Sequence, residues 1–261
     1  MPRVNSNLKV LSGDTFGEAS DPRIAEYRRK WRENPQNFVV APFPIHLDIE
    51  PTSICNLKCT FCAGTYVNYP KGMMSSEMFR EIIDEGASRG LYSAKLNFRG
   101  EPLLHPEIVE FIQYAKGAGI PDVFFNTNAT RLDEETARRI VHSGLDRLIV
   151  SFEGTEKEFY EKYRVGAVFE DVVRNVRRLR AVRDEARSAK PHIRLQTVAV
   201  SGLQEYGADY RRFWEGVADE ITMVDMRDEA ADYSGLCAPD WRCPYPWLRL
   251  CITWDGELFT C

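Results

Sequence analysis

The chain alternates between short segments whose apolar and polar residues follow a period of two and longer segments with a period near 3.6. The clearest short segment is 45–50, which predicts a strand. Further strands are expected at 94–98, 122–125, 147–152, 193–200 and 220–224. Helices are expected between them, beginning near Ser75 or Ser76, Pro106, Asp133, Val168 and residue 206. Regular alternation of this kind predicts a parallel sheet with helices outside it.

The predicted fold is an α/β protein with a partial, TIM-like (β/α)6 barrel. A complete eight-unit barrel takes about 250 residues, and the repeat here ends near residue 225. Residues 1–44 form an expected N-terminal extension with one helix, which begins at Asp21-Pro22. The core is assigned to residues 45–231. Residues 232–261 are expected to form a small Cys-rich β-hairpin subdomain, with a turn at Asp255-Gly256 between two short strands.

Composition narrows the class of protein. The 261 residues are 44% hydrophobic and 28% charged, which is typical of a globular chain. A net charge of −5 predicts no general attraction to nucleic acid or to an anionic membrane. The N-terminus has no apolar signal-peptide core, and no apolar run is long enough to cross a membrane. We therefore expect a cytoplasmic protein.

Three of the seven cysteines decide the candidate chemistry. Cys55, Cys59 and Cys62 form a C-x3-C-x2-C motif directly after the first predicted strand of the repeat. Three thiols so close together suit one metal centre with an open fourth position, and active sites of barrel-like folds follow the strands. Two alternatives stay open: a zinc knuckle with a fourth ligand such as His105, and ordinary buried cysteines.

This motif, C-x3-C-x-aromatic-C after a strand, resembles that of the radical S-adenosylmethionine (SAM) superfamily. The resemblance covers residues 45–225 and continues to residue 261. It implies that Cys55, Cys59 and Cys62 bind three irons of a [4Fe-4S] cluster and that SAM chelates the fourth iron. It also implies an electron donor such as flavodoxin or ferredoxin.

The same resemblance implies SAM contacts in later parts of the chain. Gly100 and Glu101, in Arg99-Gly100-Glu101-Pro102, match the motif that holds the methionine ammonium, with Arg99 in place of its first glycine. Asn126 ends the third strand next to Thr127-Asn128, and Ala129 stands where glycine is usual. Phe61 is expected to lie against the adenine.

Three further residues complete the implied SAM site. Ser151 lies in Ser151-Phe152-Glu153-Gly154, where glutamate replaces the aspartate of the family pattern. Arg164 resembles the arginine that pairs with the SAM carboxylate, a task for which a guanidinium fork is suited. Gln196, on the fifth strand, is expected to reach the ribose or the methionine moiety.

A second cysteine group resembles the opening of a SPASM or twitch subdomain. Cys243, Gly256 and Cys261 form C-x12-G-x4-C, which implies that Cys243 and Cys261 bind an auxiliary [4Fe-4S] cluster. The remaining ligands of that subdomain follow this point in the family, so we expect a fragment or an incomplete auxiliary site. Cys237 or Cys251 is a candidate hydrogen-atom donor, although an ordinary thiol is the simpler interpretation.

The resemblance predicts reductive cleavage of SAM to a 5′-deoxyadenosyl radical that removes hydrogen from a substrate C–H. We expect oxidation, dehydrogenation or epimerisation of a carbohydrate-like metabolite, because the 44-residue extension is shorter than a leader-binding winged-helix domain. Two alternatives remain: a radical SAM maturase acting on a peptide or protein, and a non-catalytic metal-binding protein with a structural or regulatory role.

Overall fold

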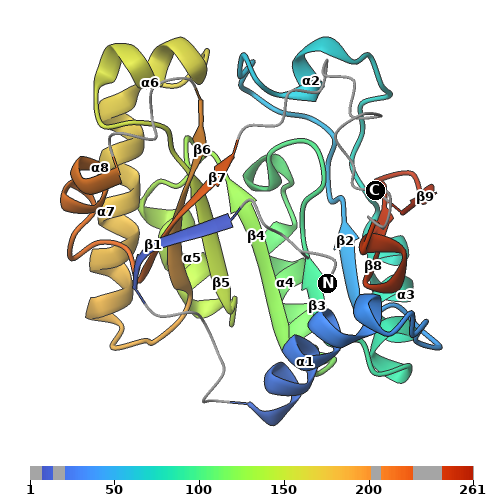
Figure 1. Ribbon diagram of the computed structural model, residues 1–261. Helices are drawn as coiled ribbons and strands as arrows, with labels where there is room; N and C mark the ends of the chain where they lie inside the picture. Colours follow the sequence, from blue (N-terminus) through green and yellow to red (C-terminus); the bar gives the residue numbers. More distant parts are fainter. Residues whose placement is uncertain (1–7, 14–20, 201–206, 226–242, 261) are drawn as a thin grey trace.

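The computed structural model describes residues 8–13, 21–200, 207–225 and 243–260. Its centre is one nine-stranded sheet with the strand order β1-β7-β6-β5-β4-β3-β2-β8-β9. Figure 1 shows the sheet curving, with helices along its outer side. Among the described residues, no helix is both long enough and apolar enough to cross a membrane.

The predicted repeat accounts for the middle of the sheet. Strands β2 to β7 lie in chain order and pair in parallel. The elements are β2 (His46–Ile49), α3 (Ser76–Ser88), β3 (Ser93–Lys95), α4 (Ile108–Gly117), β4 (Asp122–Thr127), α5 (Glu134–His142), β5 (Arg147–Ser151), α7 (Phe169–Glu185), β6 (His192–Ala199), α8 (Gly207–Phe213) and β7 (Glu220–Asp225). The predicted α/β fold with a partial barrel is therefore confirmed.

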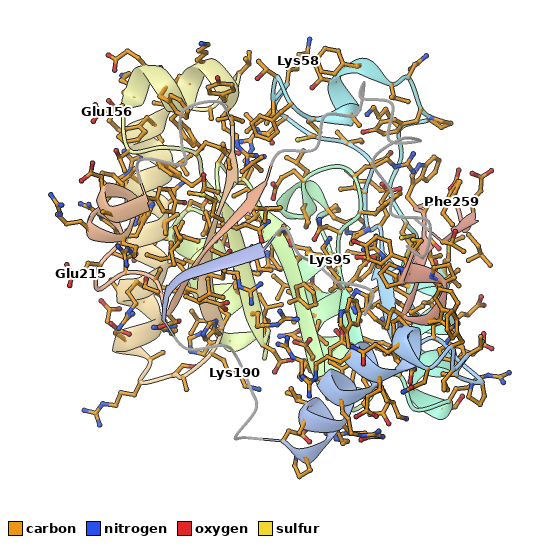
Figure 2. All side chains as sticks on the ribbon, viewed as in Figure 1. Lys58, Lys95, Glu156, Lys190, Glu215 and Phe259 are labelled. Atoms are coloured by element: carbon orange, nitrogen blue, oxygen red, sulfur yellow. The ribbon has the colours of Figure 1, made fainter. Side chains whose placement is uncertain are left out.

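Alternation along the strands separates two faces of the sheet. In β2, Leu47 and Ile49 belong to the same apolar core as Phe79 and Ile83 of α3. The residues between them point to the opposite face, since successive side chains of a strand alternate. Side chains fill the space between the sheet and its helices (Figure 2).

Predicted helix starts are confirmed where a cap is present. The Ser75 hydroxyl accepts a hydrogen bond from Met78 N at 3.2 Å, and the Asp133 carboxylate accepts one from Thr136 N at 2.8 Å. Both side chains satisfy amides that have no partner inside the helix. Strand β3 is shorter than predicted, because the Asn97 side chain, instead of the strand ladder, accepts the hydrogen bond from Asn126 N at 2.8 Å.

The N-terminal extension contains the predicted helix and an unpredicted strand. Helix α1 (Pro22–Gln36) begins after Asp21, and Tyr27 packs against Ile45 and Leu248. It lies at the end of the sheet opposite α2 (Ala63–Tyr66), as Figure 1 shows. Strand β1 (Leu8–Gly13) pairs antiparallel with β7. A six-residue strand with a bulge between Val10 and Ser12 has no sustained period-two alternation, so the pattern did not reveal it.

The predicted hairpin lies at the other edge of the sheet. Strands β8 (Arg249–Ile252) and β9 (Leu258–Phe259) pair antiparallel around Gly256, whose φ is +87°. Strand β8 also pairs in parallel with β2, so the hairpin continues the main sheet. The boundary that we predicted at residue 232 lies outside the described residues, and the division into domains stays a prediction.

Candidate metal and cofactor site

The three motif cysteines lie in the loop between β2 and α2 (Ala63–Tyr66), at the edge where the parallel strands end (Figure 1). Cys55 and Cys62 are exposed, whereas Cys59 is buried, and all three are free thiols. Cys62 is also the N-cap residue of α2. The three predicted ligands thus lie in one loop, and two of them are exposed.

Backbone hydrogen bonds attach this cysteine loop, residues 50–66, to the segment that follows β5. Lys58 N donates to Val165 O at 2.9 Å, and Thr60 N donates to Tyr163 O at 3.1 Å. Tyr163 ends α6 (Lys157–Tyr163), a helix that the sequence pattern did not predict. The middle of the cysteine motif is therefore fixed by backbone hydrogen bonds to the end of α6 and the residues after it.

Gly100 lets the loop after β3 approach the cysteine loop closely. Its φ is +65°, and a Cβ atom there would lie 2.2 Å from Thr52 O and 2.9 Å from Ile54 O. Glu101 N donates to Ile54 O at 2.8 Å. Only glycine fits such a contact, so this part of the predicted SAM motif positions the residue next to Cys55.

Arg99, the departure from the family motif, has a structural partner. It donates two hydrogen bonds to the carboxylate of Glu50, from Nε at 2.8 Å and from Nη2 at 2.7 Å. Glu50 is fully buried at the start of the cysteine loop and also accepts a bond from Trp254 N at 3.3 Å. One carboxylate therefore connects β2, the loop after β3 and the β8–β9 hairpin.

Glu101 is buried beside the cysteine loop with its carboxylate already bonded. It accepts hydrogen bonds from Thr127 Oγ1 at 2.6 Å, Asn128 N at 2.7 Å and Leu103 N at 3.2 Å. Burial raises the pKa of Glu101, and these donors act in the opposite direction. In this structure Glu101 holds the end of β4, and its predicted contact with the methionine ammonium stays a prediction.

Arg164 is buried between a carboxylate and a motif thiol. Its Nε and Nη2 atoms donate to both oxygens of Glu153, and its Nη1 lies 3.6 Å from Cys59 Sγ. Burial raises the pKa of Cys59, and the Arg164 guanidinium opposes that rise. Glu153 therefore occupies the fork that we expected to face the SAM carboxylate, so a carboxylate there would share Arg164 with Glu153. That SAM contact stays a prediction.

The other predicted SAM contacts lie on neighbouring elements. Asn126 of β4 and Gln196 of β6 both line the cavity described below, and Ser151 of β5 is the register partner of Gln196. The Asn126 Oδ1 atom is buried and has no hydrogen-bond partner among the described residues. Phe61 is partly buried, with its ring centre 5.2 Å from Cζ of Arg164.

The second cysteine group is only partly described. Cys243 is partly buried, whereas Cys261 and Cys237 lie outside the described residues. The predicted auxiliary cluster at Cys243 and Cys261 therefore stays a prediction. Cys251 is fully buried and donates from Sγ to Asp48 Oδ2 at 3.6 Å. Burial raises its pKa to about 11, which keeps it a thiol.

His105 is not placed to complete a zinc knuckle. It is buried, its Nε2 lies 3.1 Å from Met74 O, and its Nδ1 accepts from Glu107 N at 3.2 Å. Both ring nitrogens are engaged with backbone groups. Within the described part of the chain, no three His, Cys, Asp or Glu side chains are arranged around a single metal ion. His105 is therefore not available as the fourth ligand that we named for a zinc knuckle.

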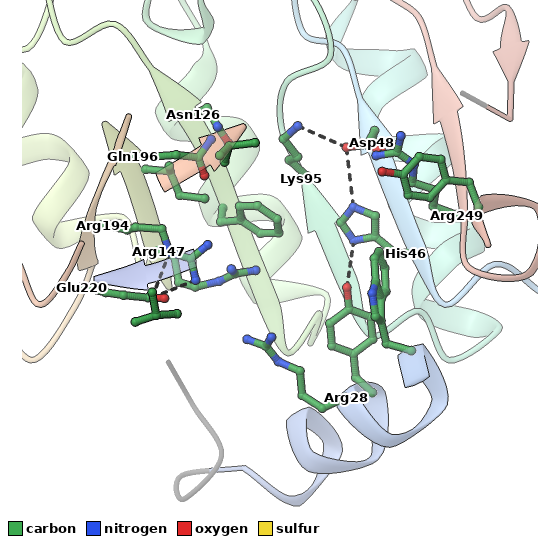
Figure 3. A pocket seen from close by; sticks show the side chains of 17 residues that line it. Arg28, His46, Asp48, Lys95, Asn126, Arg147, Arg194, Gln196, Glu220 and Arg249 are labelled. Carbon is green, nitrogen blue, oxygen red and sulfur yellow. Dashed lines mark hydrogen bonds and ion pairs between the residues drawn. The ribbon is translucent and has the colours of Figure 1, made fainter. Parts of the chain in front are cut away.

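A cavity of about 500 Å³ lies on the inner face of the sheet, between the strands and α1 (Figure 3). Residues of α1 form one end, and Asn126 and Gln196 lie toward the other. Its charged lining residues come from seven elements, one from each: Arg28, Asp48, Lys95, Arg147, Arg194, Glu220 and Arg249. Period-two alternation placed His46 and Asp48 on one face of β2, but it did not show that this face lines a cavity.

A comparison with protein families identifies the chain. The model of the radical SAM superfamily matches residues 49–186, just over half of the chain. The chain belongs to the radical SAM superfamily. The matched region begins at the end of β2 and runs through α7, so it includes the cysteine loop, Glu101 and Arg164.

Curated members of the superfamily are similar over about half of this chain. A protein named "Probable GTP 3',8-cyclase" from Methanococcus maripaludis is 32% identical over 126 residues, which is 48% of this chain and 42% of that protein. The mycofactocin maturase MftC of Mycobacterium ulcerans is 30% identical over 138 residues, 53% of this chain and 37% of that protein. The chain thus spans less than half of the length of these relatives.

Among solved structures, that of SuiB from Streptococcus suis bound to precursor peptide SuiA resembles this one. The TM-score is 0.63 at 15% identity, and the match covers 96% of this chain and 67% of that chain. At this identity the likeness concerns the fold alone. It supports the assignment of the curved sheet to the partial barrel of the radical SAM superfamily.

Radical SAM proteins use a [4Fe-4S] cluster and SAM, and the residues of this chain fit them. The donor set is three free thiols in one loop, and each thiolate of a cluster binds a different iron, so the thiols need not meet at one point. Two of the thiols have an N–H group nearby: Asn128 Nδ2 lies 4.0 Å from Cys55 Sγ, and Arg164 Nη1 lies 3.6 Å from Cys59 Sγ. Such N–H groups next to sulfur stabilise bound clusters.

Proposed function

We propose that this chain is an enzyme that cleaves SAM reductively at a [4Fe-4S] cluster held by Cys55, Cys59 and Cys62. The reaction would remove a hydrogen atom from a C–H bond of a small polar molecule in the cavity. The observation that carries the proposal is the position of the three free thiols at the strand ends of a sheet whose inner face contains that cavity. Superfamily membership supports it independently.

Each part of the site has a task that follows from its contacts. Bound together, the cluster and SAM supply a radical able to remove hydrogen from an unactivated C–H bond. Arg164 places a positive charge next to Cys59, which favours the thiolate that binds iron. Gly100 and Glu101 fix the start of the motif through Thr52 and Ile54. The exposed Cys55 and Cys62 leave the loop open to cluster assembly and to an electron donor.

The cavity supports a small-molecule substrate. A volume of about 500 Å³ is in the range of small-molecule sites. Asn126 and Gln196, which we assign to SAM, also line this cavity, so SAM and substrate would be neighbours. Tyr27 and Trp31 of α1 line the other end, so the cavity also offers aromatic surface to a substrate.

The outcome of hydrogen removal is the finer part of the proposal. We favour oxidation or epimerisation of a carbohydrate-like metabolite. An auxiliary cluster at Cys243 and Cys261 would accept the substrate electron in an oxidation. Cys251 would serve an epimerisation only by returning a hydrogen atom, and its buried S–H, bonded to Asp48, remains the candidate for that step.

A second candidate function is maturation of a peptide. It is supported by the similarity to the mycofactocin maturase MftC and by the fold shared with SuiB, whose structure contains its precursor peptide. The two candidate functions differ in how the substrate would occupy the cavity. Only one segment of a peptide would enter it, whereas a small molecule would lie in it as a whole.

Anaerobic reconstitution with iron and sulfide tests the shared chemistry. We expect about four irons per core cluster and formation of 5′-deoxyadenosine from SAM with a strong reductant. Cys59→Ala should abolish both. Thr60→Ala, an exposed residue of the same loop, is the matched control and should retain both. SAM cleavage that survives in Cys59→Ala, or one zinc per chain in place of iron, would reject the proposal.

A further inference from the structure

The cavity on the inner face of the sheet is lined mainly by cations. Its lining residues include five Arg or Lys side chains and two carboxylates. Arg28 and Arg147 have additional partners, and Arg147 is paired with Asp122 at 2.6 Å. The argument therefore concerns Lys95, Arg194 and Arg249 and the two carboxylates that they face.

The first carboxylate, Asp48, is shared by several bases. It lies 3.0 Å from Arg249 Nη1, 3.5 Å from Lys95 Nζ and 3.6 Å from His46 Nε2. Asp48 is fully buried on β2, and its register partners are Lys95 on β3 and Cys251 on β8. One negative charge thus faces two permanent positive charges, as Figure 3 shows.

Of the two permanently charged bases, Lys95 lies farther from that carboxylate than Arg249 does. Its 3.5 Å ion pair with Asp48 is the only polar contact of its amine among the residues that the structure describes. Figure 3 shows the Lys95 side chain within the cavity, and Figure 2 places Lys95 in the middle of the molecule, whereas Lys58 and Lys190 lie at its periphery. The amine carries three N–H donors, so it can keep the pair with Asp48 and still donate to a ligand.

On the opposite wall of the cavity, the charge of Arg194 is compensated by that of Glu220. Nε of Arg194 donates to Oε2 of Glu220 at 2.9 Å, and Nη2 lies 2.8 Å from the same oxygen in an ion pair; both side chains are nearly buried. The charges of this group sum to one excess positive charge, because three cations (Lys95, Arg194 and Arg249) face two carboxylates (Asp48 and Glu220). The whole chain carries a net charge of −5, so this part of the cavity lining has the opposite sign to the molecule as a whole. Charge that is removed from water is costly unless a partner compensates it.

Two unpaired polar atoms indicate which groups a ligand would need. Arg249 Nε and Asn126 Oδ1 are buried and lack a hydrogen-bond partner among the described residues. The first is a donor for a further anionic oxygen, and the second is an acceptor for a hydroxyl or an amine. A ligand with an anionic group and a hydroxyl would satisfy both.

We propose that the substrate is a small molecule with a carboxylate or a phosphate group, and that Lys95 and Arg249 bind this anion. The proposal rests on the proposed function only in calling the ligand a substrate. Both anions offer the same oxygen acceptors to a lysine and an arginine. A neutral sugar would leave the excess charge uncompensated.

Thermal unfolding of the reconstituted protein with SAM tests the site without any turnover. The probes are glucuronate, glucose 6-phosphate and glucose, at equal ionic strength set with potassium chloride. We expect at least one of the two anions to raise the melting temperature, and glucose to leave it unchanged. The stronger of the two anions identifies the group as a carboxylate or a phosphate.

Two variants of one residue separate charge from folding. Lys95→Gln should weaken the apparent affinity for the anion about tenfold or more, whereas Lys95→Arg should retain it. Arg212→Gln is the control, because its side chain is 75% exposed on α8, away from the cavity lining. Visible absorbance of the cluster confirms that each variant is assembled.

Several outcomes would overturn the anion site: stabilisation by glucose equal to that by the anions, an unchanged response in Lys95→Gln, or no response to either anion. The proposed function fails separately. A protein that binds the anion through Lys95 but forms no 5′-deoxyadenosine would reject the reaction and leave the site standing.

Discussion

At the scale of single residues, the site is organised by buried charges with several partners. Glu153 is fully buried and its carboxylate is bonded to Arg164, which also reaches Cys59. Glu50 has the same role for Arg99. In both places a glutamate or arginine departs from the family pattern, and in both the departure forms an ion pair. Replacing one partner of such a pair leaves the other charge buried without a counter-charge.

Glu153→Gln should therefore destabilise the protein strongly. Removing one partner of a buried ion pair costs about 3–5 kcal/mol, because the remaining charge of Arg164 is left uncompensated. Urea unfolding measures the change. Glu134→Gln is the control, since Glu134 and its partner Arg138 are both more than half exposed and should contribute little. Equal stability of the two variants would contradict this account.

At the scale of elements, contacts between loops fix the cysteine motif. The loop after β3 approaches the cysteine loop at Gly100, and α6 holds it from the other side through Tyr163 and Val165. Both contacts use the backbone. The motif geometry therefore depends on how neighbouring strands end, as well as on the cysteines.

Gly100→Ala should disturb both stability and metal binding. A side chain at φ +65° costs about 1 kcal/mol or more, and its Cβ would meet Thr52 O at 2.2 Å. We expect a lower denaturant midpoint and a lower iron content after reconstitution. Gly117→Ala, at the end of α4 with no atom within 4 Å of its Cβ, should be neutral or stabilising. Normal iron content in Gly100→Ala would refute the role given to this glycine.

The elements that the sequence predicted were those with long periodic patterns and caps, such as α3 after Ser75 and α5 after Asp133. Strand β1 was missed because it lacks a sustained period-two alternation, and the seven-residue helix α6 was missed because it is short and has no side-chain cap. The motif loop was predicted from its cysteines. The pairing of Arg164 with Glu153 was not predicted. Whether Arg164 faces the carboxylate of a ligand or that of Glu153 depends on side-chain packing, which the sequence pattern does not contain.

At the scale of the whole molecule, one carboxylate joins three strands. Asp48 on β2 faces Lys95 on β3 and Arg249 on β8. Burial alone would raise the pKa of Asp48, but the neighbouring His46 ring and the charges of Lys95 and Arg249 lower it below its usual range. The sheet edge is thus stabilised by an ionised acid.

This predicts a loss of stability in acid. The folded state lowers the pKa of Asp48, so its contribution is complete above about pH 4 and is lost as the pH falls toward the lower, folded pKa. Urea unfolding between pH 7 and pH 2.5 measures it. The stability gap between wild type and Asp48→Asn should narrow as the pH falls. Asp171→Asn is the control, because the ion pair of Asp171 with Arg174 is half exposed and its loss should change the stability little. A gap that stays wide for Asp48→Asn would exclude this role.

The position of β8 has a consequence for how the chain is made. Strand β2 lies between β3 and β8, so His46–Ile49 are paired on both sides only when Arg249–Ile252 are available. Strand β1 depends in the same way on β7. Pairings between such distant segments form slowly, because a long loop must close first. On the ribosome, the strand that leads into the cysteine motif therefore waits with an open edge until nearly all of these 261 residues have been synthesised.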